Sequence, residues 1–327
     1  MDVICCGMYR ACSTWQYEVI GHLIEWRRRG ERLGYVEGSS YHPAPGRGRF
    51  RVLKCHDQHP RFALAVAEGD ALAVYSYRDL RDVVDSMRHK TGRSFEALMG
   101  EGLVHRILSN DRFWITRPGV LVQRYEDLVA DPASGVLELA QFLGISLTSD
   151  EAEEIAEAYS PEANRRRAEA VRRQALDRGL DPDDPSQILH HDPQTLLNGN
   201  HLRSGRVGGW REALSPDEQA TLGPLIGSWL ITRGYERDLS WVPSAPQGLR
   251  LSLCLARSRW HCLVYFTARR YPRLAAFARR LLRFDRPSRA ELPPTASVRW
   301  LPGISRHAGL LRPFRSRIKN QNKEHIR

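Results

Sequence analysis

Residues 3–15 read VICCGMYRACSTW, and this stretch decides the fold. It opens with a short apolar run, Val3 to Cys6, passes through a turn of small and polar residues, and enters a helical pattern near Ser13. The pattern continues to about residue 29, where Gly30 fits a helix end. The sequence therefore predicts a strand, a loop and a helix in that order. The predicted apolar stripe of the helix consists of Trp15, Val19, Leu23 and Trp26.

Further apolar runs predict more strands, and helical patterns separate them. Strands that alternate with helices are typical of a parallel sheet, so we predict an α/β fold with three α/β/α layers around a central parallel sheet. In such sheets the ligand crevice lies beyond the carboxyl ends of the strands. The predicted strands are 50–53, 71–76 and 120–123, and the predicted helices are 79–90, 94–110, 132–143, 148–159 and 215–233.

Composition and charge divide the chain. Its 327 residues are 42% hydrophobic and 27% charged, which excludes a collagen or a wholly disordered chain. The net charge of +11 is uneven, since residues 245–327 hold 19 Lys and Arg against three Asp and Glu, and the preceding residues hold 30 against 35. We predict a catalytic domain of residues 1–243 with a lid or insertion at 160–200. Residues 244–327 are predicted to be a basic C-terminal extension, partly helical and partly disordered.

The six cysteines and the N-terminal stretch bear on location. The cysteines lack paired spacing, so they predict a reducing compartment rather than a disulfide framework. The run Val3 to Met8 is shorter than a signal-peptide core and has no basic segment before it. No run approaches 18 apolar residues. We therefore expect a cytoplasmic protein without a membrane span.

Residues 9–15 place a cation, two hydroxyls and several backbone amides at a strand-to-helix turn. Helix N-termini bind anions in this way. A plain capped helix, with Ser13 or Thr14 as the cap and Trp15 in the core, remains the alternative. The pattern GxxxxGK[ST] of nucleoside triphosphatases is absent, which disfavours a nucleotide kinase.

Lys54 and His56 directly follow the second predicted strand, where a period of two points both to one face. A histidine with an ordinary pKa accepts protons near neutral pH, and a lysine stabilises charge on a leaving oxygen. The alternative is a surface loop that also contains His59.

Two more polar segments fit a phosphate. Arg78 follows a predicted strand and Ser86 lies about two helical turns later, which suits a phosphate clamp or, alternatively, a salt-bridged helix. Residues 200–210 form a basic, glycine-rich segment. Such a segment offers amides and guanidinium groups to an anion, although a flexible linker has the same composition.

These segments, in this order, resemble the cytosolic-type sulfotransferase family that uses 3′-phosphoadenosine 5′-phosphosulfate (PAPS). Residues 10–15 resemble the family's phosphosulfate loop, PKSGTTW, and Arg78 with Ser86 resembles its 3′-phosphate motif. Residues 203–210 resemble its RKGxxGxW segment, and residues 124–132 its YEDL…DP string. The match extends to about residue 240.

The resemblance implies a P-loop-like α/β fold and a role for each matching residue. It implies that His56 is the catalytic base, that Lys54 is its cationic neighbour and that Arg10 lies near the bridging oxygen of PAPS. It further implies that Trp15 stacks on the adenine and that Tyr125 reaches the adenine edge. The residues implied to bind PAPS are Arg10, Ala11, Cys12, Ser13, Thr14, Trp15, Arg78, Ser86, Tyr125, Arg203, Ser204 and Gly205.

Three positions depart from the family pattern. The loop lysine is Arg10 here, the glycine is Cys12 and the proline is Tyr9. The planar fork of an arginine suits two phosphosulfate oxygens but sits differently over a bridging oxygen. A Cβ at Cys12 restricts the turn where that residue needs a positive φ.

The resemblance implies transfer of the sulfuryl group of PAPS to a hydroxyl or amine of a small-molecule or glycan acceptor, giving adenosine 3′,5′-bisphosphate without a metal. The alternative is a catalytically impaired, membrane-associated module that binds PAPS or the bisphosphate. No specific nucleic acid is expected as a partner.

The basic extension suggests a second partner. Residues 252–284 mix aromatic residues with many arginines, and four apolar residues follow helical spacing. This pattern predicts an amphipathic helix on an anionic membrane surface, peripheral at the inner face. A helical subdomain that packs on the body with a solvated arginine face remains the alternative. The four apolar residues are Leu274, Phe277, Leu281 and Phe284.

Overall fold

The structure is a computed structural model that describes residues 1–27, 30–43, 49–181, 195–197, 205–244, 256–261, 263–265 and 267. The strands are β1 Asp2–Cys5, β2 Gly30–Tyr35, β3 Phe50–Lys54, β4 Ala71–Tyr77 and β5 Val120–Arg124. The helices up to β5 are α1 Ser13–Arg27, α2 Pro60–Ala67, α3 Leu80–Thr91, α4 Phe95–Gly100 and α5 Leu103–Ile115. Those after β5 are α6 Tyr125–Ala130, α7 Pro132–Phe142, α8 Ser149–Ala158, α9 Pro161–Asp177, α10 Trp210–Ala213 and α11 Pro216–Thr232.

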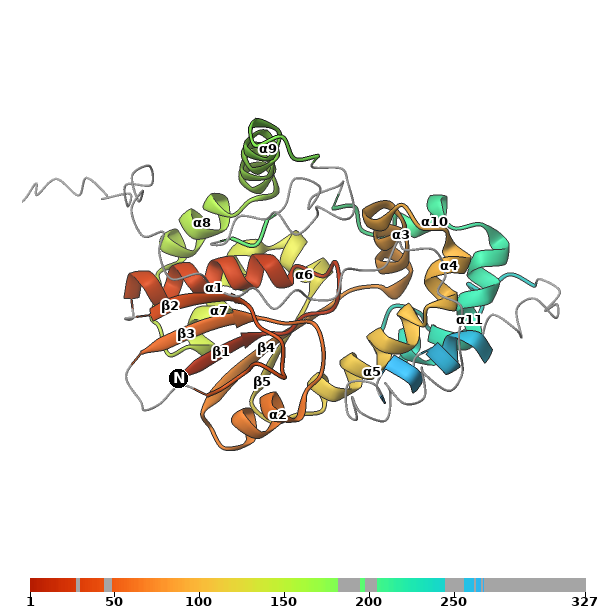
Figure 1. The fold of residues 1–327 in the computed structure, drawn as a ribbon, viewed down its shortest axis with the longest axis horizontal. Coiled ribbons are helices and arrows are strands. Elements are labelled where there is room, and N and C mark those ends of the chain that lie inside the picture. The colour runs from red at the N-terminus through yellow and green to blue at the C-terminus, as the bar shows by residue number, and fades with distance from the viewer. Residues whose placement is uncertain are drawn as a thin grey trace, which may run out of the picture. The chain divides into compact units, whose positions relative to one another are not determined.

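The five strands form one parallel sheet in the order β2-β3-β1-β4-β5 (Figure 1). β1 lies at the centre, where Cys5 is in register with Lys54 of β3 and with Val74 of β4. The predicted central parallel sheet with helices is confirmed. Because all five strands run the same way, the turns that follow β1, β3, β4 and β5 meet at one edge of the sheet.

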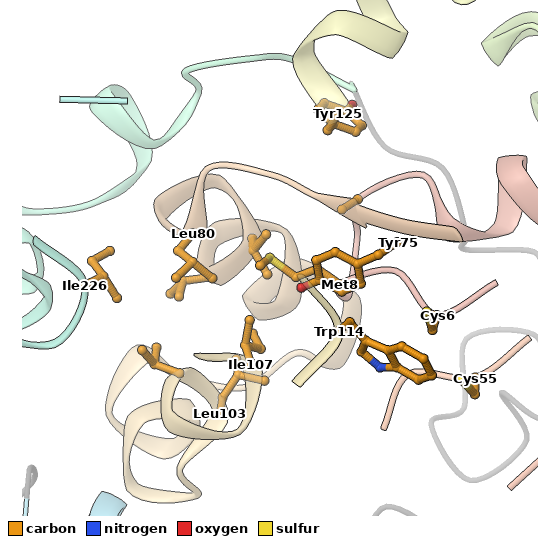
Figure 2. Packing of buried hydrophobic residues seen from close by; sticks show 14 of the residues in the cluster. Cys6, Met8, Cys55, Tyr75, Leu80, Leu103, Ile107, Trp114, Tyr125 and Ile226 are labelled. Carbon is orange, nitrogen blue, oxygen red and sulfur yellow. The ribbon is translucent and has the colours of Figure 1, made fainter. Parts of the chain in front are cut away.

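Helices cover both faces of the sheet, and β1 shows why. Val3 and Cys5 pack into a cluster that includes residues of α1, α7 and α8, whereas Ile4 and Cys6 pack into a cluster with residues of α2, α3, α5 and α11. Figure 2 shows part of the second cluster, including Cys6 next to β1 and Ile226 of α11. A strand that is buried on both faces needs a continuous apolar run, and β1 has one.

Most predicted elements occur, with one division. The predicted strands and the helices at 79–90, 132–143, 148–159 and 215–233 correspond to elements of the fold. The single helix predicted at 94–110 is instead α4 and α5, because Gly102 takes a left-handed conformation with φ 74° between them. Glycine adopts this conformation without the steric penalty of a Cβ.

Four elements were not predicted, and one predicted stripe is wrong. The sequence-based prediction lacks β2, α2, α6 and α10, and Gly30 begins β2 rather than ending a helix. In α1, Val19 and Leu23 are fully buried, but Trp26 is 47% exposed. The helix packs against both the sheet and α7, so polar residues such as Gln16 are buried in it as well. Its buried surface is therefore wider than one stripe.

The predicted domain limits remain a prediction. α9 occupies the start of the predicted 160–200 lid, and most of the rest of that lid lies outside the described residues. Of the basic extension, residues 256–261, 263–265 and 267 are helical, whereas the stripe from Leu274 to Phe284 lies outside the described part. Within the described residues, no helix is both long and apolar enough to cross a bilayer.

Candidate active site

The turn between β1 and α1 is held against β4 by backbone hydrogen bonds. The amides of Cys6 and Met8 donate to the carbonyl oxygens of Val74 (2.9 Å) and Ser76 (2.7 Å). Gly7 lies between them, and a Cβ there would come within 2.1 Å of Ser76 Oγ. The sequence therefore needs a glycine at this position for the turn to lie so close to β4.

Arg10 and Cys12 both have left-handed backbone conformations, with φ 62° and 66°. For residues other than glycine this region is sparsely populated, and each costs about 1–3 kcal/mol unless the surroundings enforce it. The predicted restriction at Cys12 is thus a real feature of the turn. Ser13 and Thr14, both buried, then begin α1 at the edge of the sheet where the strands end.

Lys54 connects the end of β3 to this turn, because its Nζ donates a hydrogen bond to Thr14 Oγ1. The lysine side chain lies almost completely out of contact with solvent. Burial, opposed mainly by the nearby Cys5, lowers the pKa of Lys54 from 10.5 to about 8. The ammonium group is therefore a buried cation beside the hydroxyls at the start of α1.

His56 faces the same turn. Its Nδ1 lies 2.9 Å from the carbonyl oxygen of Gly7, which can only accept, so Nδ1 carries the proton and Nε2 keeps its lone pair. The Tyr9 ring packs against the imidazole with centroids 4.7 Å apart. Burial, reinforced by Lys54, lowers the pKa of His56 to about 3. His56 is thus neutral at physiological pH, whereas the sequence suggested a histidine with an ordinary pKa.

Arg10 contacts both Ser86 of α3 and Arg78, which precedes α3, so the arrangement differs from the predicted phosphate clamp. Arg10 Nε donates to Ser86 Oγ at 2.9 Å, and Arg78 Nη1 donates to the Arg10 carbonyl oxygen at 3.3 Å. Arg10 therefore lies between the two residues that were predicted to hold one phosphate. Arg78 and Ser86 are both buried, and Arg78 Nε has no hydrogen-bond partner in the described part of the chain.

The glycine-rich segment reaches the site through its described end. The Tyr125 hydroxyl donates to the Gly205 carbonyl oxygen at 2.7 Å, and Arg78 Nη2 donates to the Arg206 carbonyl oxygen at 2.7 Å. The Arg78 guanidinium also lies 4.1 Å from the centre of the Tyr125 ring. Gly205 thus belongs to the same site as Arg78, whereas Arg203 and Ser204 lie outside the described residues.

Asp82 fixes the next turn of this segment. Its carboxylate accepts hydrogen bonds from the amides of Gly208 (2.8 Å) and Trp210 (2.9 Å), and it lies 3.4 Å from Arg78 Nη2. Sequence reasoning placed Asp82 only in the first turn of a helix. No local pattern points to a partner 126 residues away, so this anchor was missed.

Trp15 and Ala11 occupy less open positions. Ala11 is fully buried beside the α3 side of the sheet, and Trp15 is half-buried against the opposite cluster. The Trp15 ring passes over Gly135 of α7, where a Cβ would lie 3.3 Å from Cη2. Adenine stacking on Trp15 remains a prediction.

A partly buried lysine and a buried glutamate near the site were also missed. Lys90 follows Ser86 by one turn of α3, and burial, together with Arg10 and Lys54, lowers its pKa to about 7. Glu18 follows Thr14 by one turn of α1 and accepts a hydrogen bond from Asn164 Nδ2 at 3.1 Å. Burial raises the pKa of Glu18 to about 8. The i, i+4 spacing from a predicted site residue is the signal that would have found both.

Taken together, a buried cation, two hydroxyls and a neutral imidazole meet where β1 leads into α1, with Arg10 in the same turn and Arg78 at the end of the neighbouring strand β4. This arrangement defines a binding site for an anionic group beside a proton acceptor. Among the described residues, no group of three or more His, Cys, Asp or Glu side chains is placed to hold a metal ion.

Comparison with known proteins identifies the family. A profile described as a sulfotransferase domain matches residues 2–230, so the chain belongs to the sulfotransferase domain family. The predicted PAPS-dependent sulfotransferase family, and with it the class of enzyme, is confirmed. No curated protein matches the sequence significantly.

A solved structure shares the fold. A mouse sulfotransferase, SULT7A1, complexed with PAP, is similar with a TM-score of 0.52 and 18% identity over 73% of this chain and 86% of its own. Retinol dehydratase with androsterone and inactive cofactor PAP gives a TM-score of 0.48 and 17% identity, over 70% of this chain and 80% of that one.

Proposed function

We propose that this chain transfers the sulfuryl group of PAPS to a hydroxyl or amine of a small-molecule or glycan acceptor. The observation that supports this most directly is the meeting of Lys54, His56 and Thr14 at the start of α1. A donor anion at this helix N-terminus lies beside both a cation and a free imidazole lone pair.

The residues divide the chemical work in this proposal. The acceptor oxygen or nitrogen forms a bond to sulfur while the bond from sulfur to the phosphate oxygen breaks. His56 Nε2 takes the acceptor proton, and Lys54 with Arg10 stabilises the negative charge that develops on the leaving phosphate. Adenosine 3′,5′-bisphosphate and the sulfated acceptor are the products.

The low pKa of His56 fits this sequence of events. Before the donor binds, the imidazole is neutral, and so it is already in the form that accepts a proton. An anionic donor next to the ring favours the charged imidazolium and so raises its pKa. The base therefore becomes stronger when the donor is in place.

The test combines donor binding with product formation. The full chain is incubated with ³⁵S-labelled PAPS and a cell extract, and the label is followed into lipid, glycan, protein and small-molecule fractions. The proposal expects label in one fraction and tight binding of adenosine 3′,5′-bisphosphate by calorimetry. Binding without transfer to any fraction would instead support the second candidate.

That second candidate is a catalytically impaired module that binds PAPS or the bisphosphate. The hydrogen bond between Arg10 Nε and Ser86 Oγ favours it, because it directs this guanidinium toward α3. The candidate expects bisphosphate binding that Arg78→Ala abolishes, together with no sulfated product. Arg10→Lys restores the family's loop residue and distinguishes the candidates further. It would create activity in an impaired module and alter it only moderately in an active enzyme.

We also propose a cytoplasmic protein that docks on the anionic inner membrane surface through its basic extension. Trp260, Leu263 and Val264, which are 49%, 60% and 40% exposed, lie at helical spacing on one helical segment. Arg257 and Arg259 on the same segment are exposed as well. An aromatic and aliphatic face flanked by arginines suits the interface of an anionic bilayer.

Cosedimentation tests this docking. The full chain is expected to bind vesicles of phosphatidylserine and phosphatidylcholine better than vesicles of phosphatidylcholine alone, and less so as salt increases. Trp260→Ala with Leu263→Ala is expected to weaken binding. Leu176→Ala, which removes an equally exposed apolar side chain from α9, is the control. Equal binding by both variants would exclude this surface.

A further inference from the structure

The turn that carries His56 is held from α5. Asn110, a buried residue of α5, donates through Nδ2 to the His56 carbonyl oxygen (3.0 Å) and to Asp57 Oδ1 (3.3 Å). Its own Oδ1 accepts from the Gln58 amide at 3.2 Å. One side chain, that of Asn110, therefore forms hydrogen bonds with three consecutive residues after β3 and fixes this turn.

The second oxygen of Asp57 is held from the far end of the sequence. Tyr265, which belongs to the helical residues 256–261, 263–265 and 267, donates its hydroxyl to Asp57 Oδ2 at 3.0 Å. A second contact fixes the same segment to α5, since the buried Ser258 hydroxyl lies 2.8 Å from His105 Nδ1. Figure 1 shows helical pieces of this segment, in blue, beside α5. The start of the basic extension is thus docked next to the residue that follows the proposed base.

A stack of side chains joins Tyr265 to His56 itself. The Arg106 guanidinium carbon lies 5.0 Å from the centre of the Tyr265 ring and 5.7 Å from the centre of the Tyr9 ring. Both distances are within the range of a cation–π contact. The Tyr9 ring in turn packs against the His56 imidazole, with centroids 4.7 Å apart. Tyr265 therefore reaches His56 by two routes, through Asp57 and through Arg106 with Tyr9.

We propose that the helical residues around Ser258 and Tyr265 complete the active site on the side of His56, and that Tyr265 is a positioning residue for this base. The proposal rests on the proposed function, because it assumes that His56 acts in proton transfer. The Tyr265 hydroxyl holds the second oxygen of the carboxylate next to the proposed base, and the Tyr265 ring packs against Arg106 at the end of the stack that leads to His56. The basic extension then has a role in catalysis that is separate from any role at a membrane.

The experiment compares Tyr265→Phe, which removes only the hydroxyl, with Tyr265→Ala, which also removes the ring from Arg106. The matched control is Tyr41→Phe, because Tyr41 also donates to a carboxylate, Asp2 Oδ2 at 2.8 Å, at the opposite end of β1. Each full-length variant is first compared with the wild type by thermal unfolding, and its affinity for adenosine 3′,5′-bisphosphate is measured by calorimetry.

Two readouts report on the base. Turnover of labelled PAPS is expected to fall about tenfold in Tyr265→Phe and up to about 100-fold in Tyr265→Ala, the range expected when a catalytic group is displaced by an ångström or less. Bisphosphate affinity is expected to stay within about twofold, since Tyr265 acts on the proposed base and not on the residues that bind the nucleotide. The ¹³Cε1 NMR signal of His56 is expected to shift in both variants and not in Tyr41→Phe. Its titration is expected to move toward higher pH, because an opened stack lets water reach the ring.

A double-mutant cycle with Asp57→Ala tests the route. If Tyr265 acts through Asp57, the change to Phe has little further effect in the Asp57→Ala background. An unchanged His56 signal together with unchanged turnover in Tyr265→Ala would overturn the proposal, as would a full additive loss in the cycle. A wild-type protein that neither binds the bisphosphate nor consumes PAPS would refute the proposed function instead, and the His56 signal would still test the placement of Tyr265.

Discussion

The two halves of the active site are built differently. In the half at the ends of β1 and β3, main-chain hydrogen bonds hold the turn after β1 against β4, and Lys54 ends a buried strand, while Asn110 of α5 supports the turn after His56. The half around α3 depends on side chains that reach across the sequence, such as Asp82 to the amides of Gly208 and Trp210. The first half therefore depends mainly on the sheet, whereas the second depends on side-chain contacts between residues that are far apart in the sequence.

The difference separates chemistry from affinity. The proposed base His56 and the buried Lys54 lie in the half at the ends of β1 and β3, so substitutions there are expected to change turnover more than binding. Arg78 and Tyr125 lie in the other half, where substitutions are expected to change donor affinity. Each of the following predictions tests one side of this division.

Replacement of the base gives the largest expected effect. His56→Ala is expected to lower turnover of labelled PAPS by about 10²–10⁴, the usual contribution of a general base, while bisphosphate affinity stays near the wild-type value. His42→Ala is the control, because this histidine is exposed and its ring nitrogen Nδ1 lies 3.0 Å from the Ser40 carbonyl oxygen of its own loop. Wild-type turnover in His56→Ala would remove His56 from the mechanism.

Arg78→Ala is expected to weaken bisphosphate binding roughly 100-fold, because it removes a buried guanidinium that also holds the Arg206 carbonyl. Arg78→Lys keeps the charge but not the fork and is expected to recover only part of this loss. Isothermal calorimetry measures both variants. If the affinity of Arg78→Ala equals that of the wild type, the donor does not use this half of the site.

The pH profile tests the half at the ends of β1 and β3. Lys54 is charged below its pKa of about 8, so kcat/KM for PAPS is expected to fall about tenfold per pH unit above that value. Lys90, with a pKa of about 7, is the other amine nearby, and Lys90→Met is expected to leave the fall near pH 8 in place. For stability the sign is opposite. Because folding lowers the pKa of Lys54, this group adds stability as pH rises from about 8 toward 10.5.

The smallest expected effect concerns the turn after β1. Cys12→Gly is expected to raise the free energy of unfolding by up to about 1 kcal/mol, because glycine adopts the observed φ of 66° without a Cβ penalty. Ala11→Gly is the matched control. It is expected to destabilise by about 0.4–1 kcal/mol, since Ala11 has no positive φ and glycine adds entropy to the unfolded chain. Urea unfolding compares the two, and a less stable Cys12→Gly would show that the turn does not carry strain.

The sequence was sufficient for the elements with strong periodicity and for residues next to strand ends. β2 was missed because its sequence, GERLGY, has two glycines and two charged residues, as is usual for an exposed edge strand. α6 was missed because its six residues were interpreted as part of a family motif rather than as a helix. Short or exposed elements carry too little periodicity to be recognised alone.

For the site, the strand-end rule brought Arg10, Lys54, His56 and Arg78 together correctly. The rule did not predict which of these side chains form hydrogen bonds with one another or with other residues. The bond from Arg10 to Ser86 depends on how α3 packs, and the bond from Asp82 to Gly208 joins residues far apart in sequence. Such contacts follow from tertiary packing, which a local pattern does not record.

The central place of β1 has a consequence for how the chain acquires its fold. β1 precedes both of its partners, β3 and β4, and pairs with each of them. During synthesis its apolar residues have no neighbouring strand until residue 54, the end of β3, has left the ribosome, and they lack the second one until residue 77, the end of β4. Parallel pairing of this kind is slow, and unpaired apolar strands aggregate, so this nascent segment is the one that a chaperone would be expected to shield.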